Sequence, residues 1–203
     1  TTGGKSASLD VSATPGGTAS ATLAGTGAPP AALSIVPGSH AYGDQVTGTS
    51  SSDVTFTVTN TGGVNSGVPS PALSGTNSTE FTIATNNCSA ALAPNANCTV
   101  LVHFNPTTTG GKSASLDVSA TPGGTTSASL TGNGLAPAQL AIAPASIDYG
   151  NATVGNSSVD VTFTISNTGG ATSGTPSAPA LTGTNPGDFA VGNNTCTAAL
   201  APR

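Results

Sequence analysis

The stretch DVTFTVTN at residues 53–60 returns almost unchanged as DVTFTISN at residues 160–167. In both, every second residue is apolar, and a period of two is typical of a β-strand that buries one face. Shorter rows of the same kind occur elsewhere, and no stretch has a helical period, so the sequence predicts an all-β protein. The inward-facing rows are Val54, Phe56 and Val58; Val161, Phe163 and Ile165; Ala7, Leu9 and Val11; Ala21 and Leu23; Leu33 and Ile35; Phe81 and Ile83; and Val100, Val102 and Phe104.

The recurrence extends over the whole chain of 203 residues. Residues 1–18 and 108–125 are identical, and an offset of 107, or 108 after one inserted residue, aligns the remainder. Self-similarity at a fixed period indicates a repeat architecture. We therefore predict three parts: residues 1–27 as the C-terminal strands of a preceding repeat, residues 28–134 as a complete repeat, and residues 135–203 as the N-terminal part of a following repeat. Because both ends fall inside a repeat and the sequence has no Met, we expect a window of a longer array.

Turn signals separate the predicted strands and define the architecture. TPGG at residues 14–17 and 121–124 predicts a hairpin with a type II turn, in which Pro presets φ and Gly takes a positive φ. About seven short strands in each 107-residue period, each with one apolar face, predict two antiparallel sheets packed face to face. The expected fold is therefore a series of antiparallel β-sandwich domains.

The cysteines predict a covalent staple. Cys88 and Cys98 bracket a short loop, and we expect a disulfide between them, which implies an oxidising compartment. The alternative is a zinc site formed by Cys88, Cys98 and His103, but strand alternation places His103 on the face opposite Cys98. Cys196 aligns with Cys88, and we expect its partner beyond residue 203.

Composition argues against several classes of function. Charged residues make up 5% of the chain and the formal net charge is −5, so no basic patch exists for nucleic acid or anionic membranes. No catalytic motif, phosphate-binding loop or calcium loop is present, and His40 is matched by Ile147 in the other copy. We expect no enzymatic activity, no cofactor and no metal site. Asp44 and Asp148, near the repeat boundaries, are the candidates for calcium between domains.

The order of motifs in the complete repeat resembles a known family. AYGD, VTFTVTNTGG, LSGTNSTEFTIATNNC, LAPNANCTVLVHFNPTTTGGKSASLDV and LTGNG follow one another as in the ASH-type (Hydin-like) immunoglobulin-like repeat, the choice-of-anchor D domain of bacterial surface proteins. The resemblance implies tandem immunoglobulin-like β-sandwich domains on secreted or cell-surface bacterial proteins, with no catalytic residues to carry over. The near-absence of charge and the cysteines favour an extracellular location.

The expected function is structural. Short Pro-containing connectors at residues 25–33 and 132–140 limit bending between repeats. We therefore expect an extracellular stalk, fibre or filament whose partners are neighbouring copies of itself. A covalent array is favoured over head-to-tail strand donation, because residues 1–27 do not bring the strand equivalent to residues 98–104. The alternative is an adhesin that binds a glycan or a surface protein through its loops. No membrane insertion is expected in this segment.

Overall fold

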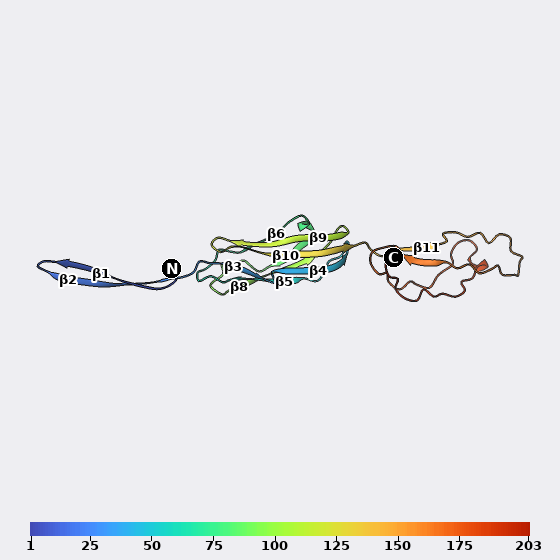
Figure 1. The fold of residues 1–203 in the computed structure, drawn as a ribbon. Coiled ribbons are helices and arrows are strands. Elements are labelled where there is room, and N and C mark those ends of the chain that lie inside the picture. The colour runs from blue at the N-terminus through green and yellow to red at the C-terminus, as the bar shows by residue number, and fades with distance from the viewer.

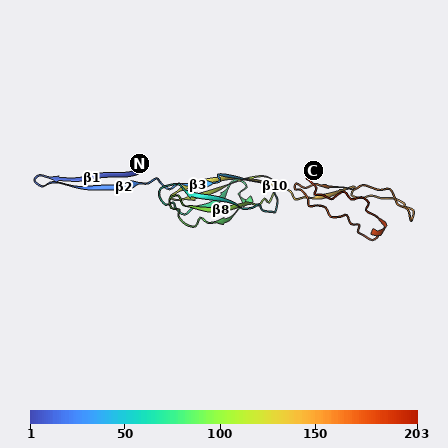
Figure 2. The same ribbon diagram turned by 90° about the horizontal axis from the view of Figure 1, so that it is seen from below.

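The computed structural model describes residues 1–203 as three parts that follow one another in a row (Figure 1). A hairpin of β1 (Gly3–Ala13) and β2 (Gly17–Gly27) lies at one end. Residues 28–134, called the middle unit below, form a two-layered body. Residues 135–203, the C-terminal unit, lie at the other end, and the view turned by 90° shows the same order (Figure 2).

The middle unit is an immunoglobulin-like β-sandwich, as the sequence predicts. One sheet has the strand order β3-β5-β8-β7 and the other has the order β4-β10-β9-β6. All neighbouring strands are antiparallel except β4 and β10, which run parallel. The bounds are β3 (Leu33–Val36), β4 (Ser39–Val46), β5 (Val54–Asn60), β6 (Ser70–Ser74), β7 (Phe81–Asn86), β8 (Asn97–Phe104), β9 (Gly110–Ala120) and β10 (Gly124–Leu135), with the 3-10 helix η1 (Ser78–Glu80) before β7.

The sandwich has eight strands where the sequence indicates about seven. The additional strand is β4, whose partly buried row begins with His40 and Tyr42 and carries no aliphatic alternation. Its parallel pairing with β10 was not predicted either. The Tyr42 hydroxyl donates a hydrogen bond to the carbonyl oxygen of Val102 at 2.8 Å, so a polar tip here ties one sheet to the other.

The core consists of the predicted alternating rows of the middle unit, whereas two rows predicted to face inward, Ala7, Leu9 and Val11, and Ala21 and Leu23, are exposed. The rings of Phe81 and Phe104 lie 4.9 Å apart between the sheets. Aliphatic side chains from β5, β8, β9 and β10 fill the rest of the space, and each of these strands sends its other row to the surface. The side chains with no exposed surface include Phe56, Val58, Val100, Val102, Phe104, Leu116, Val118 and Leu130.

The N-terminal hairpin has the predicted pairing but a different loop. Strands β1 and β2 pair antiparallel from Gly3↔Gly27 to Ala13↔Gly17. Three residues therefore lie between the last paired residues, and the positive φ values fall at Gly16 (153°) and Gly17 (77°), which is not a type II turn. Every residue of β1 is exposed, whereas β9, which has the same amino-acid sequence, buries part of its residues.

The C-terminal unit forms fewer strands than predicted. Only β11 (Leu140–Ala143) and β12 (Thr164–Asn167) pair, and η2 (Pro186–Asp188) is a single 3-10 turn. The predicted strand over residues 160–167 is therefore extended only in its second half. In the middle unit β5 pairs with β8 from Val54 to Thr59, whereas beside β12 only an isolated bridge between Asn167 and Pro202 forms. The division at residues 27/28 and 134/135 stays a prediction.

Candidate functional site at the unit junctions

The junction between the hairpin and the middle unit is organised by one buried side chain, Asn60. It continues the inward row of β5 and has no exposed surface. Its Oδ1 accepts hydrogen bonds from the backbone N–H groups of Ala32 (3.2 Å) and Gly62 (3.0 Å). Its Nδ2 donates to the carbonyl oxygens of Val64 (2.8 Å) and Leu92 (2.9 Å). One amide therefore joins the connector, the turn after β5 and the disulfide loop.

The same arrangement recurs around Asn167, which is 1% exposed. Its Oδ1 accepts from the N–H groups of Gln139 and Gly169, both at 3.0 Å. Its Nδ2 donates to the carbonyl oxygens of Ala171 (2.7 Å) and Leu200 (3.0 Å). Four hydrogen bonds therefore form at each junction, and their partners are equivalent in the two repeats. They form at Asn167 even though the C-terminal unit has only one pair of strands.

Asn60 and Asn167 were not among the site residues predicted from the sequence. The signal was present, because both occupy the position where the alternation of Val54, Phe56 and Val58 predicts an apolar residue. A polar residue in an inward-facing row is the informative exception, since buried polar groups need hydrogen-bond partners.

Glycine at the turn after each asparagine lets the connector approach the unit. A Cβ on Gly62 would lie 2.1 Å from the Pro30 carbonyl oxygen, and one on Gly169 would lie 2.0 Å from the Pro137 carbonyl oxygen. Any side chain at these positions would push the connector away. The repeated Asn-Thr-Gly-Gly sequence is therefore a docking turn for the preceding connector as well as a strand end.

Backbone hydrogen bonds leave almost no free connector between the units. The N–H of Gly170 donates to the carbonyl oxygen of Ala136 at 3.2 Å, and β10 ends one residue earlier, at Leu135. At the other junction the N–H of Gly63 donates to the carbonyl oxygen of Pro29 at 3.1 Å, two residues after β2 ends at Gly27. Each unit is therefore held to the strand that enters it.

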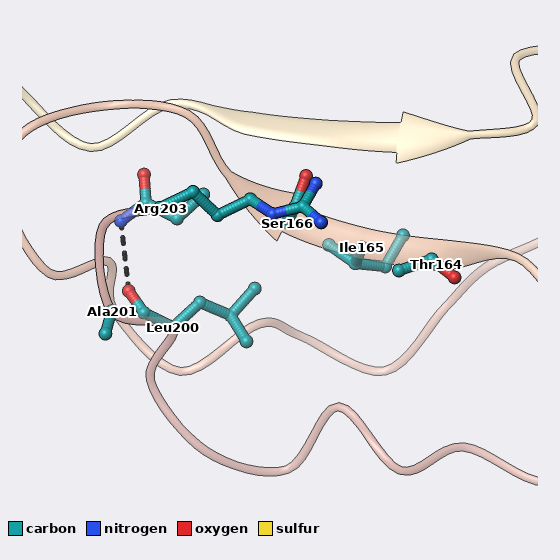
Figure 3. A pocket seen from close by; sticks show the side chains of 7 residues that line it. Thr164, Ile165, Ser166, Leu200, Ala201 and Arg203 are labelled. Atoms are coloured by element: carbon teal, nitrogen blue, oxygen red, sulfur yellow. Dashed lines mark hydrogen bonds between the residues drawn. The ribbon is translucent and has the colours of Figure 1, made fainter.

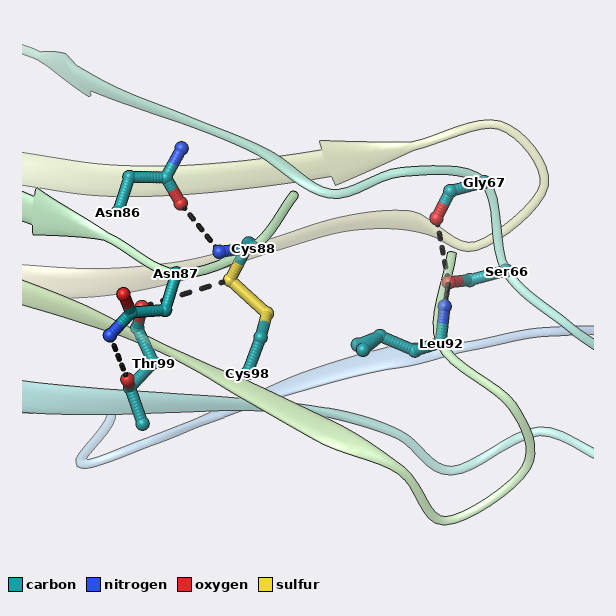
Figure 4. The surroundings of a disulfide bond; sticks show 8 residues. All are labelled: Ser66, Gly67, Asn86, Asn87, Cys88, Leu92, Cys98 and Thr99. Carbon is teal, nitrogen blue, oxygen red and sulfur yellow. Dashed lines mark hydrogen bonds between the residues drawn. A yellow bond between two sulfur atoms is a disulfide. The ribbon is translucent and has the colours of Figure 1, made fainter. Parts of the chain in front are cut away.

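The predicted disulfide between Cys88 and Cys98 is present, with the two Cα atoms 5.1 Å apart (Figure 4). Cys88 is buried and belongs to the core, so the bond closes the loop of residues 88–98 onto the sandwich. Within this loop, the Leu92 N–H donates to the Ser66 hydroxyl at 3.1 Å and the Leu92 carbonyl accepts from Asn60. The disulfide therefore supports the junction through Leu92.

The disulfide excludes the zinc alternative, because both sulfur atoms are bonded to each other. His103 lies on the outer face, as alternation predicts, and its Nδ1 is 2.9 Å from Asp53 Oδ1. Cys196 is a free thiol. Its expected partner beyond residue 203 stays a prediction.

The calcium candidates are not brought together. Asp44 Oδ1 accepts a hydrogen bond from the Asn133 side chain, and Asp148 Oδ1 accepts one from the Gly150 N–H. No group of three or more His, Cys, Asp or Glu side chains is placed to hold a metal ion. His40 packs edge-on against Tyr42, with the ring centroids 4.6 Å apart. Neither short helix has the length and hydropathy of a membrane-crossing helix.

One ion pair is partly withdrawn from solvent. The Glu80 carboxylate accepts hydrogen bonds from the backbone N–H of Thr107, from the Thr107 hydroxyl (2.9 Å) and from the Thr108 hydroxyl (3.3 Å), while Lys112 Nζ lies 4.0 Å away. The Thr107 N–H is the largest cause that holds the pKa of Glu80 below its ordinary value. Both side chains of the pair are less than 10% exposed, so the pair fixes β9 to η1.

A pocket in the C-terminal unit lies beside β12, where β8 pairs with β5 in the middle unit (Figure 3). The Ile165 and Leu200 side chains face it, and Arg203 extends along it from the last residues of the chain. Nothing in its lining forms a catalytic or ligand-binding constellation. The pocket is an incompletely covered part of the sandwich interior.

Comparisons with known proteins found only distant structural likeness. No protein-family model and no curated protein matches the sequence. The secreted serine protease VesC from Vibrio cholerae is 26% identical over 51% of this chain and 23% of its own, with a TM-score of 0.39. A protein of unknown function from Porphyromonas gingivalis is 11% identical over 66% of both chains (TM-score 0.42). The ASH/PapD-like domain 7 of human CEP192 is 17% identical over 55% of this chain and 91% of its own (TM-score 0.41). At these scores the fold assignment rests on the sheets described above.

Proposed function

We propose that this chain is a structural segment of an extracellular bacterial fibre, filament or surface stalk, built from tandem immunoglobulin-like domains. Its work is mechanical: each repeat adds length, and each junction transmits orientation to the next repeat. The chain is not an enzyme in this proposal, and it needs no cofactor.

The recurring four-bond asparagine junction is the observation that carries the proposal. A binding module or an enzyme domain needs no identical device at each boundary, whereas a rod needs every joint to be fixed. With no more than one residue between the end of a strand and the docked connector, there is little chain left to bend. Short connectors that contain Pro restrict bending further.

Two other features support an extracellular location. The Cys88–Cys98 disulfide is of a kind that persists in oxidising compartments. Surface polarity comes from hydroxyl and amide groups, since only 5% of the residues are charged. This composition gives no electrostatic attraction to nucleic acid or to anionic lipid.

The proposal is tested by immunogold electron microscopy of intact cells that make the protein, with antibodies against the folded middle unit. The expected result is label along surface fibres or stalks without permeabilisation. A control antibody against a cytoplasmic protein should not label the same cells. Label that appears only after permeabilisation contradicts the proposal.

A further inference from the structure

The middle unit is entered and left at opposite ends. The connector before it docks beside Asn60, and the chain leaves it after Leu135, the last residue of β10. The hairpin and the C-terminal unit accordingly lie on opposite sides of the middle unit (Figures 1 and 2). Tension along a row of such units therefore acts along the long axis of the middle unit.

The strands that receive this tension from the two ends are neighbours. The entering chain forms β3 and continues, after two residues, as β4. Strand β4 lies at the edge of its sheet, where β10 is its only neighbour. Because the two strands are parallel, tension pulls β4 toward the entry and β10 toward the exit, so it shears their whole ladder. In an antiparallel pair both loaded ends would lie together, and the hydrogen bonds would open one at a time.

The β4–β10 ladder is closed by a backbone hydrogen bond at each end. Six residues of β4 have a paired residue on β10. Before the first pair, the Ser129 N–H donates to the Gly38 carbonyl oxygen at 3.0 Å. After the last pair, the Thr47 N–H donates to the Leu135 carbonyl oxygen at 2.9 Å. Since the hydrogen bonds of a parallel ladder are evenly spaced, they share a load that acts along the strands.

Strand β4 has a second attachment, to the opposite sheet. The Tyr42 hydroxyl donates to the carbonyl oxygen of Val102 on β8 at 2.8 Å. The centroid of its ring lies 5.8 Å from that of Phe81 and 6.1 Å from that of Phe104. If β4 slides along β10, this hydrogen bond must break and the ring must move past both neighbours. Both sheets therefore oppose the same movement.

We propose that the β4–β10 ladder and the Tyr42 hydroxyl form a mechanical clamp, through which the middle unit resists tension along the rod. This inference rests on the proposed structural function and adds load bearing to it. It also gives a role to the parallel pairing of β4 with β10, which the sequence did not predict.

Force spectroscopy of the 203-residue chain in two pulling directions tests the clamp without altering it. In the axial variant, handles are attached at Ala28→Cys and Ala138→Cys, so the middle unit is loaded along its axis. In the transverse variant, they are attached at Ser39→Cys and Ser129→Cys, which lie opposite each other and open the ladder from one end. All four positions are exposed, and both variants carry Cys196→Ser.

The direction of pulling should decide the resistance. At equal loading rate, unfolding of the middle unit should need at least about twice as much force in the axial variant as in the transverse variant, because forced unfolding is governed by the unfolding rate under load. Equal forces, or a lower axial force, overturn the proposal. Such a result would not overturn the structural function, which the immunogold labelling of surface fibres tests separately.

Two hydroxyl deletions separate the clamp from overall stability. Tyr42→Phe removes the hydrogen bond from β4 to Val102, whereas Thr82→Val removes a hydrogen bond from β7 to the Asn105 side chain, outside the clamp. Under axial load, Tyr42→Phe should lower the unfolding force and Thr82→Val should leave it unchanged. Urea unfolding of both variants gives the loss of equilibrium stability for comparison. Equal falls in force, in proportion to that loss, show that stability alone sets the resistance and overturn the proposal.

Discussion

Replacement of Asn60 by aspartate isolates the contribution of the junction amide, because the two side chains have nearly the same shape. The variant keeps an acceptor for the Ala32 and Gly62 N–H groups but loses the donor to the Val64 and Leu92 carbonyl oxygens. The Leu92 carbonyl oxygen keeps a hydrogen bond from the Ser66 N–H at 2.9 Å, so only the Val64 carbonyl oxygen is left without its protein partner, at a cost of about 1–3 kcal/mol. The free energy of unfolding should therefore fall by at least about 1–3 kcal/mol at pH 7, a large part of the stability of a small domain.

The loss should depend on pH in a defined direction. Position 60 has no exposed surface and two carbonyl oxygens face it, so the pKa of an aspartate there is raised above its unfolded value. A folded state that binds the proton more tightly loses stability as the pH rises, so the defect is smaller at pH 4 than at pH 7. Urea unfolding followed by far-UV circular dichroism at both pH values measures this. Asn97→Asp, at an exposed position, is the control, and equal urea midpoints for the two variants at pH 7 would refute the account.

Three further outcomes follow from the same structure. Reduction of Cys88–Cys98 should lower the free energy of unfolding by about 2.5–3 kcal/mol, measured by urea unfolding with and without reductant, and no change would show that the loop is held by other contacts. The pKa of Glu80 is lower in the folded state than its unfolded value of 4.5, so the stability that Glu80 contributes is present above pH 4.5 and is lost as the pH falls below it. Glu80→Gln should therefore reduce the fall in the free energy of unfolding between pH 5 and lower pH, measured by urea unfolding. An unchanged fall contradicts this role of Glu80. Leu116→Ala should lower the free energy of unfolding by about 2–5 kcal/mol, because Leu116 is fully buried. Leu9→Ala, in identical flanking sequence, should change it by less than about 0.5 kcal/mol in the monomer, because Leu9 is exposed. Similar losses in the two variants, measured by urea unfolding, would contradict the packing described here.

The alternation of apolar residues was sufficient to predict the central strands of both sheets, each of which lies between two other strands. The rows containing Phe56, Val100 and Leu116 are buried as expected, because a period of two commits one whole face of a strand to the core. Strand β4 was not predicted, because its inward positions include His40 and Tyr42 and no aliphatic alternation. The burial of Tyr42 depends on Phe81 and Val102, which lie in other strands. Its parallel pairing with β10 depends on the tertiary arrangement of the strands, which no local sequence pattern predicts.

The junction was only half predictable. The connectors and the Asn-Thr-Gly-Gly turns were recognised, but their direct contact was not, because the partners of Asn60 come from positions up to 32 residues away. The C-terminal strand over residues 160–167 shows the converse limit. A strong local pattern does not form a full strand when the neighbour it pairs with is not in place.

Small-angle X-ray scattering of the monomeric chain measures whether the units form a stiff row. Strands of 11 and 12 residues at about 3.3 Å per residue give each unit a length of about 40 Å, and three in line give about 120 Å. A rod of that length has a radius of gyration of about 35 Å, whereas a compact chain of this size has one of about 17 Å. A value near 35 Å that falls when Asn60 and Asn167 are both replaced by alanine supports the account, and a value near 17 Å for the unaltered chain contradicts it.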